Sequence, residues 1–260
     1  MCFSFDALPP DLPADLAVPP LAGGARAEVL ELTSADGTRF SAGLAEAPEP
    51  KGPAVVILPD VRGLYRFYIA LAERFAQAGH HAIAIDYFGR TAGTGERGED
   101  FEYMPHVAET RPELVQADTA AAIDALHERT GASSFVTVGF CFGGTNSFLA
   151  ATNPDLPLDA VVGFYGGLAA RPNRPSPIDS AEQTRVPVLA LFGAADENIP
   201  PDQVDAFDRG LDEAGVEHEV HSYPGAPHSF FDRRYEEHAE ASEDAWRRVL
   251  GFLDRIGAAV

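Results

Sequence analysis

The chain has 260 residues, 45% of them hydrophobic and 23% charged, and its 40 acidic residues against 19 basic ones give a formal net charge of −21. Such a charge repels nucleic acids and anionic membranes, so neither is expected as a partner. No apolar run approaches the ~20 residues that a membrane-spanning helix needs, and the length suits one large α/β domain.

The N-terminal segment, residues 1–26, is rich in proline and lacks hydrophobic periodicity, which predicts an extended arm over the surface. It has no basic stretch ahead of an apolar one, so no signal peptide is expected. The chain contains two cysteines, Cys2 and Cys141. Two cysteines far apart in the sequence fit a reducing compartment, and a cytoplasmic location is therefore expected.

The rest of the chain alternates between strand and helix patterns. Residues 27–32 and 39–47 have strand character, and Asp36-Gly37 between them is a favourable hairpin turn. Further buried-strand patterns lie at 54–58, 81–86, 135–140, 160–166, 186–193 and 217–223, and helical patterns at 68–79, 112–130, 143–152, 202–215 and about 236–256. This order predicts an α/β fold over residues 27–260: one mostly parallel, doubly wound sheet of about eight strands, flanked by helices, with the N-terminal antiparallel hairpin at its edge.

Cys141 follows the predicted strand 135–140 and precedes a predicted helix. The sequence GFCFG at 139–143 has the pattern of a nucleophile elbow, in which glycines two positions before and after the nucleophile avoid a clash in a tight strand-to-helix turn. The N-terminus of the following helix favours a negative charge, which helps a thiol to become a thiolate. We therefore interpret Cys141 as a nucleophile rather than a small buried side chain.

An elbow nucleophile needs an acid and a histidine, which follow it in that order in this architecture. Asp196 comes directly after the predicted strand 186–193, and His228 lies on the loop after the strand 217–223. Both positions are at the carboxyl edge of a parallel sheet, as is that of Cys141. We expect His228 to take the thiol proton, and Asp196 to orient the imidazole and stabilise its charged form.

Glu197 and Asp202 are alternative acids, although Asp196 directly follows the strand. The other histidines fall at the opposite sheet edge, within a strand or on helices, and they do not cluster as metal ligands do, so no metal is expected. Elbow enzymes bind the oxyanion with the backbone N–H after the nucleophile and one from the loop after the third strand. Those groups belong here to Phe142 and Val61.

The motifs VGFCFGG around Cys141, FGAAD around Asp196 and PGAPHSF around His228 resemble those of the dienelactone hydrolases (carboxymethylenebutenolidases), cysteine enzymes of the α/β-hydrolase fold. The resemblance covers about residues 55–231. It implies a Cys-Asp-His triad at these three positions within a catalytic domain, and it implies no cofactor. It also implies that a small ester or lactone is hydrolysed through a cysteinyl acyl-enzyme, as when dienelactone is opened to maleylacetate in aromatic degradation.

The same resemblance implies roles for residues outside the triad. The family has a glutamate after the third strand that holds the resting thiol neutral. Asp60 matches it with one methylene less, unless Asp60 only caps its loop or pairs with Arg62. Two family arginines bind the substrate carboxylate. Arg90 matches the first, whereas Asp232 stands at the position of the second, for which Arg233 or Arg62 is a candidate replacement.

Four aromatic residues near strand ends are expected to line an apolar substrate pocket or to belong to the core: Tyr87, Phe140, Phe142 and Tyr165. The prediction is thus a carboxylic ester hydrolase whose partner is a small-molecule ester or lactone, with monomer and dimer both open. Asp232 also favours a second hypothesis, a carboxylesterase or thioesterase for uncharged acyl groups. A non-catalytic binding protein is a third hypothesis, and a redox role of Cys141 with Cys2 as resolving thiol is a fourth.

Overall fold

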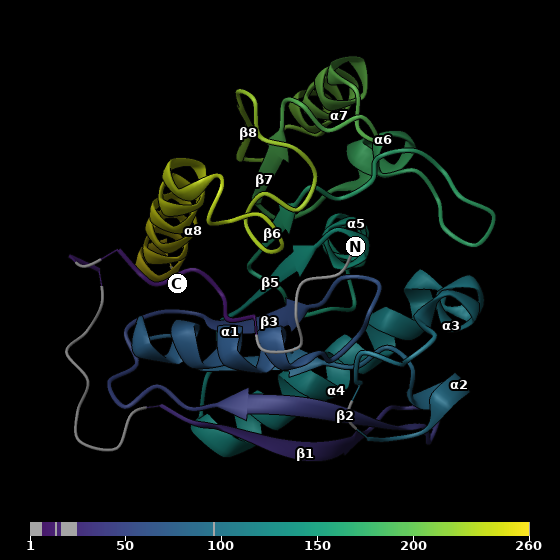
Figure 1. Cartoon of the computed structure of the whole chain (residues 1–260), viewed down its shortest axis with the longest axis vertical. Coiled ribbons are helices and arrows are strands. Elements are labelled where there is room, and N and C mark those ends of the chain that lie inside the picture. Colours follow the sequence, from purple (N-terminus) through teal and green to yellow (C-terminus); the bar gives the residue numbers. More distant parts are fainter. Residues whose placement is uncertain (1–6, 14, 17–24, 96, 260) are drawn as a thin grey trace.

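The computed structural model describes residues 7–13, 15–16, 25–95 and 97–259. Its centre is an eight-stranded sheet in the order β1-β2-β4-β3-β5-β6-β7-β8 (Figure 1). The strands are β1 (Ala27–Thr33), β2 (Arg39–Ala45), β3 (Ala54–Leu58), β4 (Ala82–Ile85), β5 (Phe135–Phe140), β6 (Ala160–Phe164), β7 (Val188–Gly193) and β8 (His218–Tyr223). β2 pairs antiparallel with β1 and β4, and the other neighbours are parallel. The predicted mostly parallel sheet with an antiparallel pair at its edge is confirmed.

Helices cover both faces of this sheet (Figure 1). On one face, α1 (Arg66–Gln77) packs near α8 (Ala239–Ala259), where the ring centroids of Phe75 and Trp246 are 5.1 Å apart. The other face carries α4 (Pro112–Thr130), α5 (Phe142–Ala150) and α7 (Pro201–Ala214). The shorter helices are α2 (Gly89–Ala92), α3 (Tyr103–Glu109), α6 (Pro177–Ser180) and the 3₁₀ turn η1 (Ala181–Gln183).

The two covered faces explain the sequence pattern of the central strands. β3, β5 and β7 are buried along their whole length. Strands covered on both faces read as continuous apolar runs, which is how the sequence predicts them. The bounds of α4 are equally well marked, because Pro112 occupies its first turn and Gly131 ends it with a φ of 74°.

The order of the strands creates a crevice at the carboxyl end of β3. β4 lies on one side of β3 and β5 on the other, and ligands of open parallel sheets bind at such points. Leu58, the last residue of β3, is the register partner of Gly139 in β5. The loop after Leu58 and the turn that carries Cys141 therefore emerge side by side.

Several short elements differ from the sequence prediction. The patterns do not predict α2, α3 and α6, which have 4, 7 and 4 residues, and α2 and α3 bury no side chain. Without a buried stripe, such helices leave no hydrophobic period to detect. α8 begins at Ala239 and ends at Ala259, about three residues later than predicted, and β2 ends at Ala45 rather than at residue 47.

The described part of the predicted arm, residues 7–13 and 15–16, is tied to α1 and α8. Trp246 Nε1 donates a hydrogen bond of 3.3 Å to the carbonyl oxygen of Pro10, and Asp11 pairs with Arg74 at 2.7 Å. Apart from residues 25 and 26, the rest of the arm, with Cys2, lies outside the described residues. Within the part of the chain that the structure describes, no helix is long and apolar enough to cross a membrane.

Candidate active site

Cys141 lies in a strained turn between β5 and α5, with φ 53° and ψ −109°. Such a conformation is costly for a residue with a side chain and occurs where the surrounding structure enforces it. The flanking glycines show what enforces it. A Cβ on Gly139 would lie 2.1 Å from the carbonyl oxygen of Gly143, and a Cβ on Gly143 would lie 1.9 Å from that of Leu58. Only glycine fits at both positions, and the half-buried thiol of Cys141 is held at the start of α5.

His228 and Asp196 meet beside this turn. Asp196 follows β7 and His228 follows β8, and the distance from His228 Nδ1 to Asp196 Oδ2 is 2.6 Å. The side chain of Asp196 is fully buried, whereas that of His228 is 20% exposed. The other carboxylate oxygen, Oδ1, accepts a hydrogen bond of 2.9 Å from the backbone N–H of Asn198. Asp196 is therefore fixed from two sides and can orient the imidazole.

The charges of this group favour a protonated imidazole. Burial lowers the pKa of His228, but its hydrogen bond to Asp196 and its interactions with the nearby Cys141 and with the Asp196 charge more than offset this and raise the pKa to about 10. Burial raises the pKa of Asp196, and its hydrogen bond and charge interaction with His228 bring it below its usual value. Nδ1 is taken by Asp196, so Nε2 is the nitrogen left to exchange a proton with the thiol.

These side chains open into a pocket of about 560 Å³. Cys141, Phe142 and His228 form its floor, together with Val61 from the loop after β3. The walls come from α3 and from the loop between β6 and α6, residues 165–176. The remaining lining residues are Met104, Val107, Ala108, Thr110, Thr145, Gly167, Arg171, Pro172, Asn173, Arg174, Asn198 and Ile199.

The two walls touch over the pocket. The side-chain amide of Asn173 donates a hydrogen bond to the carbonyl oxygen of Ala108, at the end of α3. Figure 1 shows the 165–176 loop reaching from α6 towards α3. Met104 on α3 is 62% exposed, so this wall presents apolar surface at the pocket.

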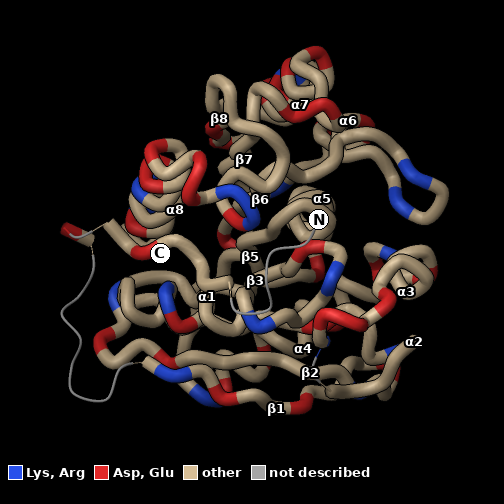
Figure 2. The backbone as a smooth tube through the Cα atoms, in the orientation of Figure 1, with Lys and Arg blue, Asp and Glu red and all other residues tan. Residues whose placement is uncertain are grey.

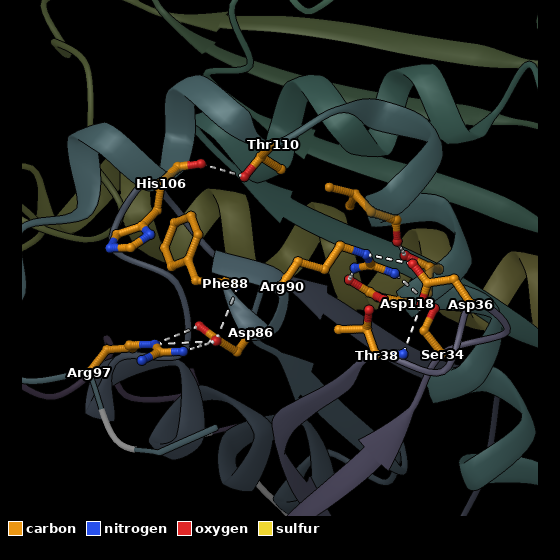
Figure 3. Close-up of polar contacts among 12 residues, drawn as sticks. Ser34, Asp36, Thr38, Asp86, Phe88, Arg90, Arg97, His106, Thr110 and Asp118 are labelled. Atoms are coloured by element: carbon orange, nitrogen blue, oxygen red, sulfur yellow. Dashed lines mark hydrogen bonds and ion pairs between the residues drawn. The ribbon is translucent and has the colours of Figure 1, made fainter. Parts of the chain in front are cut away.

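α3 is anchored to the body by charged and aromatic side chains, of which Figure 3 shows Asp86, Phe88, Arg97 and His106. Arg97 pairs with the buried Asp86 at 2.7 Å, and its Cζ lies 4.7 Å from the ring centroid of Phe101. Phe101 in turn stacks on His106 of α3, with centroids 5.0 Å apart. Thr110 closes the end of the helix by donating to the His106 carbonyl oxygen at 2.9 Å.

Asp60 is placed by Arg62 rather than by the thiol. Its Oδ2 lies 2.7 Å from Arg62 Nη2, and its Oδ1 accepts a hydrogen bond of 2.9 Å from the Arg62 backbone N–H. Among the described residues, no hydrogen bond joins Asp60 to Cys141. This is the loop cap and ion pair that the sequence left as the alternative. Asp232 lies in the same buried cluster, where burial and the Asp60 charge raise its pKa to about 6.

Arg90 does not reach the pocket, contrary to the role that the family resemblance implied for it. Its Nη1 lies 2.6 Å from Asp118 and its Nε 2.9 Å from Asp36, while Nη2 donates to Ser34 Oγ at 3.1 Å (Figure 3). Two carboxylates already hold this guanidinium, and Arg90 is not part of the pocket lining. Arg62 and Arg233, the candidate replacements, do not line the pocket either; Arg233 donates to Ser229 Oγ at 2.9 Å.

Tyr87 and Tyr165 support the site from beneath instead of lining it. The Tyr87 hydroxyl donates a hydrogen bond of 2.8 Å to the carbonyl oxygen of Pro59, and its ring lies against that of Phe142 at 5.3 Å. Tyr165 is fully buried, with its ring centroid 5.0 Å from that of His228. Both tyrosines therefore pack behind residues that form the pocket floor.

Sequence reasoning missed the arginines of the 165–176 loop. Figure 2 shows basic residues on this loop, which the sequence identifies as Arg171 and Arg174. Both line the pocket, and the Cζ of Arg174 lies 5.4 Å from the ring centroid of Phe142. The segment RPNRP has no periodicity that would place it, although two arginines in so acidic a chain were a signal. In the described ranges, no three His, Cys, Asp or Glu residues group as they would around a metal ion.

Comparisons with known proteins agree with this architecture. The profile of the Dienelactone hydrolase family matches residues 40–257. A Yersinia pestis protein named "Putative carboxymethylenebutenolidase" is 30% identical over 213 residues, 79% of each chain, and a Synechocystis protein of the same name is 31% identical over 211 residues, 76% of this chain and 83% of that one. A Klebsiella pneumoniae crystal structure described as a "Putative Dienelactone Hydrolase" superimposes with a TM-score of 0.74 at 30% identity, over 87% of this chain and 98% of that one.

The sheet order, the strained turn after β5 and the flanking helices define the α/β-hydrolase fold. Within that class, the chain belongs to the dienelactone hydrolase family. It is accordingly a hydrolase that acts on ester or lactone substrates.

Proposed function

We propose that the chain hydrolyses a small carboxylic ester or lactone through Cys141, His228 and Asp196, with a cysteinyl acyl-enzyme as intermediate. The observation that carries the proposal is the position of His228, which is hydrogen-bonded to Asp196 at 2.6 Å and lines the same pocket as Cys141. A raised imidazole pKa beside a thiol favours the thiolate–imidazolium pair, and the thiolate is the nucleophilic form.

In the first half-reaction the Cys141 sulfur attacks the ester carbonyl carbon, and the carbonyl electron pair moves onto oxygen. The backbone N–H groups of Phe142 and Val61, on the pocket floor, are the proposed donors to this oxyanion. His228 gives its proton to the alkoxide as the C–O bond breaks. In a lactone this alcohol stays attached to the acyl group, because the broken bond closed a ring.

In the second half-reaction water attacks the thioester. His228 accepts the proton of that water, the carbon–sulfur bond breaks, and the free acid leaves. Asp196 stabilises the imidazolium in both halves. A cytoplasmic location, expected because a reducing compartment preserves a free thiol, belongs to the same proposal.

A related second candidate is a carboxylesterase or thioesterase for uncharged acyl groups. The apolar pocket residues Met104, Val107 and Ile199 favour it, since they can hold an alkyl chain without any charge. The chemistry at Cys141 is the same in both cases, and the two candidates differ only in the substrate.

Hydrolysis of cis- and trans-dienelactone and of 4-nitrophenyl acetate by wild type, Cys141→Ala and Cys2→Ser tests the proposal. We expect Cys141→Ala to abolish turnover of every substrate that the wild type cleaves, and Cys2→Ser to retain it. Cleavage of the lactones points to the family reaction, and cleavage of the acetate alone to the second candidate. Turnover that survives Cys141→Ala would overturn the mechanism.

A further inference from the structure

We propose that Arg174 determines substrate selectivity by binding a carboxylate on the acyl ester or lactone that Cys141 attacks. The inference rests on the proposed function, and it assigns the anion-binding role to the loop between β6 and α6. It thereby replaces Arg90, which is held by Asp36 and Asp118 away from the pocket.

Arg174 is a partly buried cation without a carboxylate partner among the described residues. Its Nε is buried and has no hydrogen-bond partner, and none of the described residues forms an ion pair with its guanidinium. Burial lowers the pKa of Arg174, and the nearby charge of Arg171 lowers it further, whereas only Cys141 acts in the other direction. A buried charge is normally paired, because desolvating it alone is expensive.

This lack of a partner stands out in a chain with 40 acidic and 19 basic residues. Arg62, Arg90 and Arg97, which are buried or partly buried elsewhere, all pair with carboxylates at 2.6–2.7 Å. The described residues that line the pocket include no aspartate or glutamate, but they include both Arg171 and Arg174. The pocket wall is thus locally positive on an acidic protein.

The position of Arg174 fits a group carried by the substrate. Its guanidinium lies over the ring of Phe142, the residue next to Cys141, and both side chains face the same pocket. A planar guanidinium binds a carboxylate through two parallel hydrogen bonds, and one buried guanidinium neutralises the single charge of a carboxylate. The expected substrate is therefore a short acyl compound with a carboxylate a few bonds from the scissile carbonyl.

A matched pair of esters tests this selectivity. The mono-4-nitrophenyl ester of glutaric acid and 4-nitrophenyl pentanoate have acyl chains that differ only by a terminal carboxylate in place of a methyl group. After subtraction of spontaneous hydrolysis, we expect Arg174→Gln to lower the ratio of their kcat/KM values roughly 10- to 100-fold. Arg174→Lys, which keeps the charge but not the planar fork, should recover part of the ratio.

The matched control is Arg185→Gln, which removes the same formal charge at an exposed position outside the pocket lining. This variant should keep the wild-type ratio. If Arg174→Gln lowers kcat/KM for both esters by the same factor, the role of Arg174 is structural and the inference is wrong. A ratio that stays at the wild-type value in Arg174→Gln overturns it as well.

A second readout does not depend on hydrolysis. Iodoacetate and iodoacetamide both alkylate a thiolate, with a new sulfur–carbon bond and loss of iodide, but only iodoacetate carries a carboxylate. In a Cys2→Ser background, where Cys141 is the remaining thiol, we expect Arg174→Gln to lower the rate ratio of iodoacetate to iodoacetamide by roughly fivefold or more. An unchanged ratio would contradict the inference. If the wild type cleaves neither these esters nor the dienelactones, the proposed function fails while this experiment still decides the role of Arg174.

Discussion

The hydroxyl of Tyr87 donates a hydrogen bond of 2.8 Å to the carbonyl oxygen of Pro59 and so ties the end of β4 to the loop that carries Val61. The same ring packs edge-on against Phe142 at 5.3 Å. One buried side chain therefore touches the segments of both proposed oxyanion donors. The sequence left this tyrosine open between the pocket lining and the core, and it packs behind the groups that form the pocket floor.

Tyr87→Phe should lower kcat for the wild-type ester substrates while KM changes little. Loss of the hydroxyl leaves the buried Pro59 carbonyl without its donor, which costs ~1–3 kcal/mol and loosens the loop. An interaction that matters mainly in the transition state shows up in kcat. The control is Tyr223→Phe, which removes a similar hydrogen bond of 2.9 Å to Asp244 outside the pocket and should leave kcat close to wild type. Equal effects of the two variants on kcat would refute this assignment.

Gly143→Ala should destabilise the fold by ~3 kcal/mol or more, because its Cβ would lie 1.9 Å from the Leu58 carbonyl oxygen and neither backbone can easily yield. Gly251→Ala in α8 is the counterpart, since a Cβ there meets nothing within 4 Å and alanine favours helix by ~0.5–1 kcal/mol. Urea unfolding followed by circular dichroism measures both. A Gly143→Ala protein as stable as wild type would contradict the close approach of β3 and α5.

His228 should make stability depend on pH above neutrality. Its pKa rises from 6.5 to about 10 in the fold, so its contribution is fully present below pH 6.5 and is lost as pH rises through 10. The free energy of unfolding should therefore fall more between pH 7 and pH 10.5 in the wild type than in His228→Gln. The difference should be on the order of 2 kcal/mol, because ~1.4 kcal/mol per pKa unit is reduced by partial exposure of the ring. Parallel profiles for the two proteins would show that the imidazolium is not stabilised.

Asp232→Asn should stabilise the protein at pH 8 but not at pH 4. The pKa of this buried carboxyl rises from 3.8 to about 6, first because of burial and then because of the charge of Asp60; Arg62, Arg233 and the Arg233 backbone N–H act against the rise. A raised carboxyl pKa means that stability present below pH 3.8 is lost as pH rises through 6. The amide avoids that loss, of about 3 kcal/mol. Denaturant unfolding at the two pH values measures it, and a destabilised variant at pH 8 would show that the ionised form is favoured.

The sequence predicts the sheet well because its strands are short apolar runs bounded by turn residues, and β3 and β5 coincide with such runs. The positions of Cys141, Asp196 and His228 follow from the same logic, since each residue lies in the turn or loop after the carboxyl end of a strand. The two carboxylate partners of Arg90 could not be predicted in this way. Asp36 and Asp118 are distant in the chain, and nothing local shows that they converge on it.

The pocket walls escaped prediction for a related physical reason. α3 buries no residue and so leaves no periodic signal, and the 165–176 loop has neither strand nor long helix to position it. Where Arg174 lies is decided by tertiary contacts, among them the hydrogen bond from Asn173 to Ala108. The positions of side chains on such segments cannot be predicted from local sequence, because they depend on the fold of the whole chain.

Leu58 and Gly139 pair at the carboxyl ends of β3 and β5, so the loops that carry the reactive groups start from paired strands. The pocket walls do not, and they can therefore tolerate more substitutions. The reactive groups follow adjoining strands of one hydrogen-bonded sheet, in which a displaced backbone atom disturbs the neighbouring strands. The pocket walls, α3 and the 165–176 loop, contain no strand of that sheet. They contact each other through the side-chain amide of Asn173. Substitutions in the pocket walls can therefore change the preferred substrate while the residues that carry out the reaction stay the same.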